Sequence, residues 1–111
     1  MTALTPITLS SNGLGAALAC NDASGSTRVA LVGDGDALVV TNIGDYVGYL
    51  AVGDDTVTAI ASGSTASLPI LPGHQDDQIG AKLTDGSAIT HVAGVCASGQ
   101  TTTLIVHRVQ R

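Results

Sequence analysis

The chain has 111 residues, enough for one domain with a single hydrophobic core. It carries nine Asp, no Glu and only four Lys or Arg, for a formal net charge of −5. The four cations are scattered along the sequence: Arg28, Lys82, Arg108 and Arg111. We therefore exclude nucleic acid and anionic membrane surfaces as partners, since both attract clustered positive charge.

Short apolar runs alternate with turn residues along the whole sequence. Phe and Trp are absent, so Val, Leu, Ile and Ala must fill the core. Apolar runs separated by Gly, Asn, Asp and Ser about every ten residues are typical of a β-sandwich or barrel. In chain order, the predicted strands are residues 7–10, 15–20, 28–32, 36–42, 47–52, 56–61, 66–71, 78–83, 89–96 and 101–109.

This pattern predicts an all-β fold. We expect a single antiparallel β-sandwich, jelly-roll or immunoglobulin-like, or a small barrel, with about 8–10 short strands. The domain spans residues 1–111, with an extended N-terminal arm at about residues 1–6. No apolar run approaches the roughly 18–20 residues that cross a bilayer. Residues 14–20 lack the preceding positive charge of a signal peptide, so we expect them to form a strand.

Two of the predicted strands, residues 47–52 with the preceding Tyr46 and residues 89–96, are largely apolar on both faces. A strand with one face in water alternates strictly between apolar and polar residues. Two apolar faces therefore indicate that both faces of the strand are buried. The second cover is either another subunit or the wrap of a tight barrel. Charged residues make up 12% of the chain, against about a quarter in typical domains, which favours burial against partners. A monomer kept soluble by Thr, Ser and Gly is the alternative.

The two cysteines, Cys20 and Cys96, both fall in apolar predicted strands. Buried cysteine behaves as a small apolar residue, so we predict two free thiols. A single disulfide between an early and a late strand is the alternative.

The polar residues of the turns and strands offer little catalytic chemistry. Asp34 and Asp36 lie in a Gly-rich segment, which suits a hairpin turn and, as the alternative, a calcium site. His91 and His107 lie in predicted strands, but alternation places His91 and Cys96 on opposite faces, which disfavours zinc. The sequence contains no nucleophile elbow, dinucleotide-binding motif or P-loop. We expect no enzymatic activity, no cofactor and no metal.

Three segments follow one another in a distinctive order: residues 39–53 (VVTNIGDYVGYLAVG), 68–73 (LPILPG) and 90–106 (THVAGVCASGQTTTLIV). They contain a strand with Thr-Asn-x-Gly, a Pro-Gly turn, a strand with Thr-His-x-Ala and a final strand with Thr-Thr-Leu. This order resembles the small β-sandwich structural proteins of tailed bacteriophages, which are often encoded beside capsid and head genes. Each piece taken alone is also ordinary strand-and-turn chemistry, so the combination carries the resemblance.

The resemblance implies a virion component. It implies a capsid decoration (cement) protein that is assembled in the host cytoplasm, forms homotrimers on the head surface, binds the major capsid protein and stabilises the shell. A head-fibre or tail-associated carbohydrate-binding module is the alternative. Alternation places Tyr46 and Tyr49 on opposite faces of their strand, which disfavours a shared aromatic platform for sugar.

We expect the interface of such a subunit in two places. The N-terminal stretch would add a strand to a neighbouring sheet edge, and the segment around residues 46–52 would be covered by a partner. The expected interface residues are Thr2, Leu4, Ile7, Tyr46, Tyr49 and Leu50.

Overall fold

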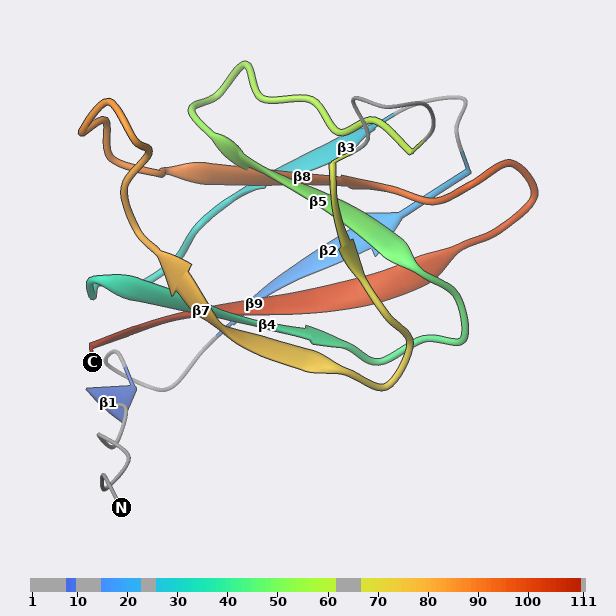
Figure 1. Cartoon of the computed structure of the whole chain (residues 1–111), viewed down its shortest axis with the longest axis horizontal. Coiled ribbons are helices and arrows are strands. Elements are labelled where there is room, and N and C mark those ends of the chain that lie inside the picture. Colours follow the sequence, from blue (N-terminus) through green and yellow to red (C-terminus); the bar gives the residue numbers. More distant parts are fainter. Residues whose placement is uncertain (1–7, 10–14, 23–25, 62–66, 111) are drawn as a thin grey trace.

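The computed structural model describes residues 8–9, 15–22, 26–61 and 67–110, with the backbone alone for Asp77 and Gln78. These residues form nine β-strands and no helix, arranged as two antiparallel sheets (Figure 1). The prediction of an all-β, sandwich-like fold is confirmed. In chain order the strands are β1 (Thr8–Leu9), β2 (Ala16–Cys20), β3 (Thr27–Ala30), β4 (Ala37–Asn42), β5 (Gly48–Gly53), β6 (Leu68–Ile70), β7 (Gln75–Gly80), β8 (His91–Val95) and β9 (Thr102–Gln110).

The order of the strands is that of a jelly roll. The β9 sheet runs β2-β9-β4-β7, with β1 pairing further along the same edge of β9, and the β8 sheet runs β3-β8-β5-β6. Strands β2 and β9, β3 and β8, β4 and β7, and β5 and β6 therefore pair in turn, as in one long hairpin folded over on itself. Jelly rolls of this kind include viral capsid and lectin domains.

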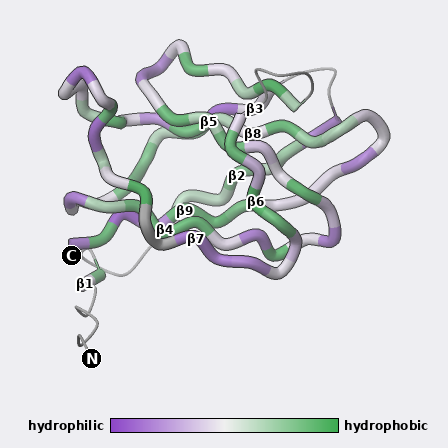
Figure 2. Tube along the Cα trace, in the orientation of Figure 1, coloured by the Kyte–Doolittle hydropathy of each residue, from purple (hydrophilic) through white to green (hydrophobic). Residues whose placement is uncertain are grey.

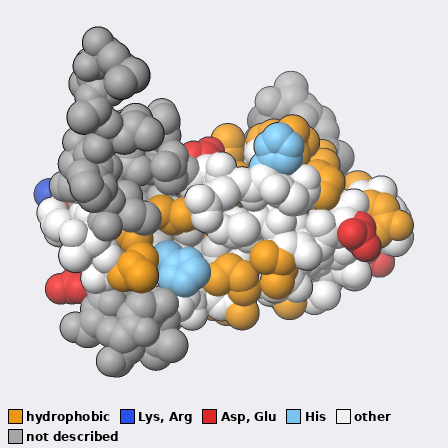
Figure 3. All heavy atoms as spheres, turned by 90° about the horizontal axis from the view of Figure 1, so that it is seen from below, with side chains coloured by type: hydrophobic (Ala, Val, Ile, Leu, Met, Phe, Trp, Pro, Cys, Tyr) orange, Lys and Arg blue, Asp and Glu red, His pale blue; other side chains and the backbone are white. Residues whose placement is uncertain are grey.

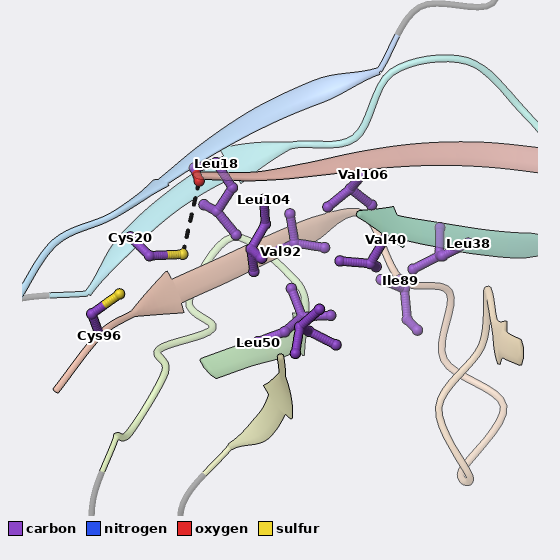
Figure 4. Packing of buried hydrophobic residues seen from close by; sticks show 11 residues of the cluster. Leu18, Cys20, Leu38, Val40, Leu50, Ile89, Val92, Cys96, Leu104 and Val106 are labelled. Carbon is purple, nitrogen blue, oxygen red and sulfur yellow. Dashed lines mark hydrogen bonds between the residues drawn. The ribbon is translucent and has the colours of Figure 1, made fainter. Parts of the chain in front are cut away.

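One apolar cluster fills the space between the two sheets (Figure 4). Leu18 and Leu104 of the β9 sheet meet Leu50 and Val92 of the β8 sheet there. In Figure 2 most of the strands are predominantly hydrophobic, whereas β7 is largely hydrophilic. Each large aliphatic side chain buried in this way stabilises the fold by about 1.5–3 kcal/mol. Leu50, which we expected at an interface, is only 2% exposed, so its side chain contributes to the core instead.

The outer face of the β8 sheet is covered by the chain itself. Ala93 and Val95 point outward from β8, and they are buried beneath the β5–β6 connection, where Val57 and Ala59 pack on them. This cover explains why two predicted strands are apolar on both faces, without a second subunit. The prediction of a strand at residues 56–61 is wrong, because this segment lies across the sheet instead of pairing within it.

Side-chain contacts from the β3 edge fasten the covering segment. The Arg28 Nη1 donates to the backbone oxygen of Val57 at 3.1 Å, and the Ser26 Oγ accepts from the backbone nitrogen of Ala59 at 2.9 Å. Two backbone groups of the segment are therefore satisfied by side chains rather than by a sheet ladder.

The outer face of the β9 sheet is different in character. Seen from that side, charged side chains lie near the margins, while apolar and neutral polar side chains occupy the middle (Figure 3). Ala37, Val39 and Val109 form a small buried cluster on this face, whereas Ala17 and Ala19 of β2 are exposed.

Candidate functional site

The strand directions bring four connections to one end of the sandwich. These are the connections between β2 and β3, β4 and β5, β6 and β7, and β8 and β9, on the right in Figure 1. We call this the β4–β5 end. Connections at the end of a rigid sandwich are free of core packing, and binding residues are often carried there.

Asn42, at the end of β4, holds this end together although it is only 1% exposed. Its Nδ2 donates to the backbone oxygens of Tyr46 and Ile70, each at 2.8 Å. Its Oδ1 accepts from the Thr102 Oγ1 at 2.7 Å and from the backbone nitrogen of Gly44 at 3.0 Å. The side-chain amide thus uses both donors and both acceptor positions, and a fully satisfied buried network fixes a single geometry.

The β4–β5 connection approaches β9 so closely that position 44 requires glycine. A Cβ atom on Gly44 would overlap the Thr102 Oγ1 and touch its Cβ. Next to it, the backbone nitrogen of Ile43 donates to the backbone oxygen of Thr103 at 3.1 Å. Residues 43–46 are therefore attached to β9 on one side and to Asn42 on the other.

This connection presents three side chains to solvent. Ile43 is 64% exposed and Tyr46 is 46% exposed, and the Asp45 carboxylate between them is also exposed. On the other side of Asn42, the β6–β7 connection is tied to the same residue by two backbone hydrogen bonds, from Gly73 to Asn42 at 3.1 Å and from Asn42 to His74 at 2.9 Å. The β4–β5 and β6–β7 connections are thereby both held in place by the same buried residue, Asn42.

A cavity of about 520 Å³ lies between this connection, the end of β2 and the start of β9. Its lining combines one aromatic ring, from Tyr46, with hydroxyl, amide and carboxylate groups from Thr101, Thr103, Asn21 and Asp45. An aromatic face with hydrogen-bonding groups around it suits an uncharged polar ligand such as a sugar, since the ring packs on C–H groups while the polar groups bind hydroxyls.

The residues expected at an interface do not come together. Tyr46 lines the cavity, whereas Tyr49 packs on the outer face of the β8 sheet beside the covering segment, and Leu50 lies in the core. Thr2, Leu4 and Ile7 lie outside the described residues. The sequence reading missed Asn42 as an organising residue, although its Thr-Asn-x-Gly context was the available signal.

The cysteines lie beneath the β4–β5 end. Cys20 and Cys96 are buried free thiols, as predicted, and they face each other from the two sheets (Figure 4). Burial, with a smaller contribution from the nearby Cys96, raises the pKa of Cys20 to about 12. A thiol with so high a pKa is a weak nucleophile near neutral pH, since the thiolate is the reactive form.

Other perturbed ionisable groups belong to turns. The pKa of Asp54 is lowered because its carboxylate accepts hydrogen bonds from the Thr56 side chain and backbone, and the pKa of Asp85 is lowered by hydrogen bonds from Ser87. Within the described ranges, no three His, Cys, Asp or Glu side chains gather as metal ligands. The same ranges contain no helix that is long and apolar enough to cross a membrane.

Comparison of the chain with known protein families, with curated proteins and with solved structures finds no match.

Proposed function

We propose that the chain is a non-enzymatic structural subunit of a viral particle, a capsid decoration protein. It is assembled in the host cytoplasm, sits on the head surface, binds the major capsid protein and associates with further copies of itself as a trimer. The jelly-roll strand order supports this assignment, because viral capsid domains share the architecture. Since a fold alone does not fix a function, the features of the β4–β5 end carry the argument.

Three of the four motifs behind the phage resemblance converge on Asn42. Thr-Asn-x-Gly supplies Asn42 and Gly44, the strand before the Pro-Gly turn supplies Ile70, and Thr-Thr-Leu supplies Thr102. All of them share the hydrogen-bond network of Asn42, so the resemblance concerns how this end of the sandwich is built. That is the observation that best supports a common structural plan.

The contact surface that we assign to the shell consists of Ile43, Tyr46 and Leu71. Leu71 is 49% exposed, and it follows Ile70, whose backbone oxygen shares the Asn42 Nδ2 with that of Tyr46. The three residues therefore belong to one rigid region. Burial of apolar surface contributes about 25 cal/mol per Å², and many symmetric copies on a shell multiply the effect.

Co-sedimentation with capsids that lack the protein tests this proposal. We expect saturable binding at a fixed number of copies per particle, and loss of binding in Ile43→Asp. Leu83→Asp is the matched control, because Leu83 is also an exposed apolar residue but lies in the β7–β8 connection at the other end. Light scattering of the purified protein tests self-association, and a monomer at high concentration would count against the trimer.

A carbohydrate-binding module of a head fibre or tail is the second candidate, and the cavity beside Tyr46 favours it. Lectin domains also include jelly rolls. On a glycan array, this candidate predicts retention that is lost in Tyr46→Ala and Asp45→Asn but kept in Tyr49→Ala, because Tyr49 lies away from the cavity. Binding to capsids free of glycan, with no retention on the array, would reject it.

A further inference from the structure

A second cavity, of about 430 Å³, lies at the opposite end of the sandwich. It is formed where the β3–β4 connection, the end of β7 with the residues after it, and the end of β9 meet. Gly35, Gly80, Ala81 and Ala88 supply small uncharged lining groups, and Lys82, Arg108 and Asp36 supply charged ones. Its lining therefore differs from that of the cavity beside Tyr46, which contains neither Lys nor Arg.

Backbone contacts keep this cavity open. Gly35 has a φ of 137°, and a Cβ atom there would overlap the backbone oxygen of Val109, so only glycine fits. The backbone nitrogen of Ala81 donates to the backbone oxygen of Asp36 at 3.1 Å, and the backbone oxygen of Ala81 accepts from Ile89 at 3.0 Å. The small side chains thus lie on a backbone that is held from both sides.

Positive charge gathers here in a chain whose net charge is −5. The described part of the chain contains three Lys or Arg residues, and two of them, Lys82 and Arg108, line this cavity. The Arg108 Nε donates to the backbone oxygen of Gly35 at 3.0 Å, which orients the guanidinium group, and its terminal nitrogens form no hydrogen bond with the described residues. Neither cation forms an ion pair with a carboxylate of the described residues, although Asp is abundant.

We propose that this cavity binds a carboxylate carried on a short aliphatic stem, such as the side chain of a glutamate. The Arg108 guanidinium suits the planar carboxylate, Lys82 adds a second positive charge, and the Gly and Ala lining accepts the stem. The two cations of the lining outnumber its one carboxylate, Asp36, whose Oδ2 accepts a hydrogen bond from the Gln110 Nε2 at 3.0 Å. This proposal is independent of the virion assignment.

The test is a titration of the full chain observed through its backbone amide NMR signals. The probe is N-acetyl-glutamate amide, and N-acetyl-glutamine amide is the matched uncharged control. We expect saturable shifts at Gly35, Gly80, Ala81 and Ala88 with the glutamate probe alone. Lys82→Gln and Arg108→Gln should each weaken binding by about tenfold or more, as expected when a charge-assisted hydrogen bond is lost.

Controls separate the site from general charge effects and from misfolding. Arg28→Gln removes a cation outside the cavity and should leave the affinity unchanged, while Arg108→Lys keeps the charge and should retain part of it. Since Lys82 is exposed, Lys82→Gln should stay folded even if Arg108→Gln does not. The proposal is overturned if the shifts do not saturate, if both probes act alike, or if Lys82→Gln binds as well as the wild type.

Two further ligands identify the source of the carboxylate. Butyrate binding as tightly as the glutamate probe would indicate a free small acid, and weaker butyrate binding would indicate an acidic residue of a partner protein. Inorganic phosphate binding more tightly than either would contradict a carboxylate site.

Discussion

The two ends of the sandwich hold their connections in different ways. At the β4–β5 end, the buried amide of Asn42 ties two connections and β9 together, and the surface above it is apolar, aromatic and acidic. At the opposite end, backbone hydrogen bonds and small residues keep a cavity open beneath Lys82 and Arg108. One strand order thus supports two chemically distinct ends, and the difference comes from the residues that follow each strand.

The largest effect is expected at Asn42. Asn42→Ala leaves the part-buried backbone oxygen of Tyr46 and the buried one of Ile70 without this donor, and Thr102 without its acceptor, so we expect a loss of roughly 3–5 kcal/mol in the free energy of unfolding. Urea denaturation measures it. Gln75→Ala, which removes an exposed hydrogen bond to Thr41, is the control and should change stability by less than about 0.5 kcal/mol. Equal losses in the free energy of unfolding of the two variants would contradict the role of Asn42 in holding the β4–β5 end together.

A smaller loss is expected at Gly44. Gly44→Ala forces the β4–β5 connection away from Thr102, and we expect a loss of about 2–3 kcal/mol together with weaker binding by this end. Gly80→Ala is the matched control, because a Cβ atom there meets nothing within 4 Å. If neither substitution changes thermal stability, the close approach of the β4–β5 connection to Thr102 does not restrict position 44 to glycine.

The thiols beneath the β4–β5 end predict a dependence on pH. The pKa of Cys20 is raised from 9.0 to about 12 on folding, so below pH 9 its contribution to stability is complete. Between pH 9 and 12 the unfolded chain ionises first, and the contribution is lost as the pH rises. The urea midpoint should therefore fall more steeply from pH 8 to pH 10.5 in the wild type than in Cys20→Ala. Parallel pH profiles would contradict the burial of this thiol.

The smallest effect is expected away from both ends. Arg28→Ala removes the hydrogen bond to Val57 that fastens the covering segment, at a cost of about 0.5–1 kcal/mol. Hydrogen exchange at the Ala59 amide should become faster, because this amide is bound to Ser26 in the same cover. Unchanged exchange would show that the cover does not depend on Arg28.

The residue types within each segment predicted most of the strands, but they did not predict which strands pair with one another. Aliphatic runs between Gly, Asn and Asp turns predicted the all-β class, and the apolar context of Cys20 and Cys96 predicted buried thiols. The segment at residues 56–61 has the same composition as a strand, yet it covers a sheet, and the side chains of Ser26 and Arg28 bind two of its backbone groups. Composition does not distinguish these two outcomes.

Contacts distant in sequence account for what the sequence did not reveal. The partners of Asn42 lie as far away as Thr102, and β2 pairs with β9 at the other end of the chain. Lys82 and Arg108 look scattered in the sequence, but the pairing of β4 with both β7 and β9 brings them to one cavity. Neither site follows from spacing alone.

The proposed role of the β4–β5 end is tested most directly by a cryo-electron microscopy reconstruction of capsids incubated with this chain. If the β4–β5 end is the contact surface, we expect the sandwiches to be grouped in threes, with residues 43–46 and Leu71 against the shell and the Lys82 end directed away from it. Decoration through the outer face of the β9 sheet, or no added density on the shell, would contradict the assignment of the β4–β5 end as the contact surface.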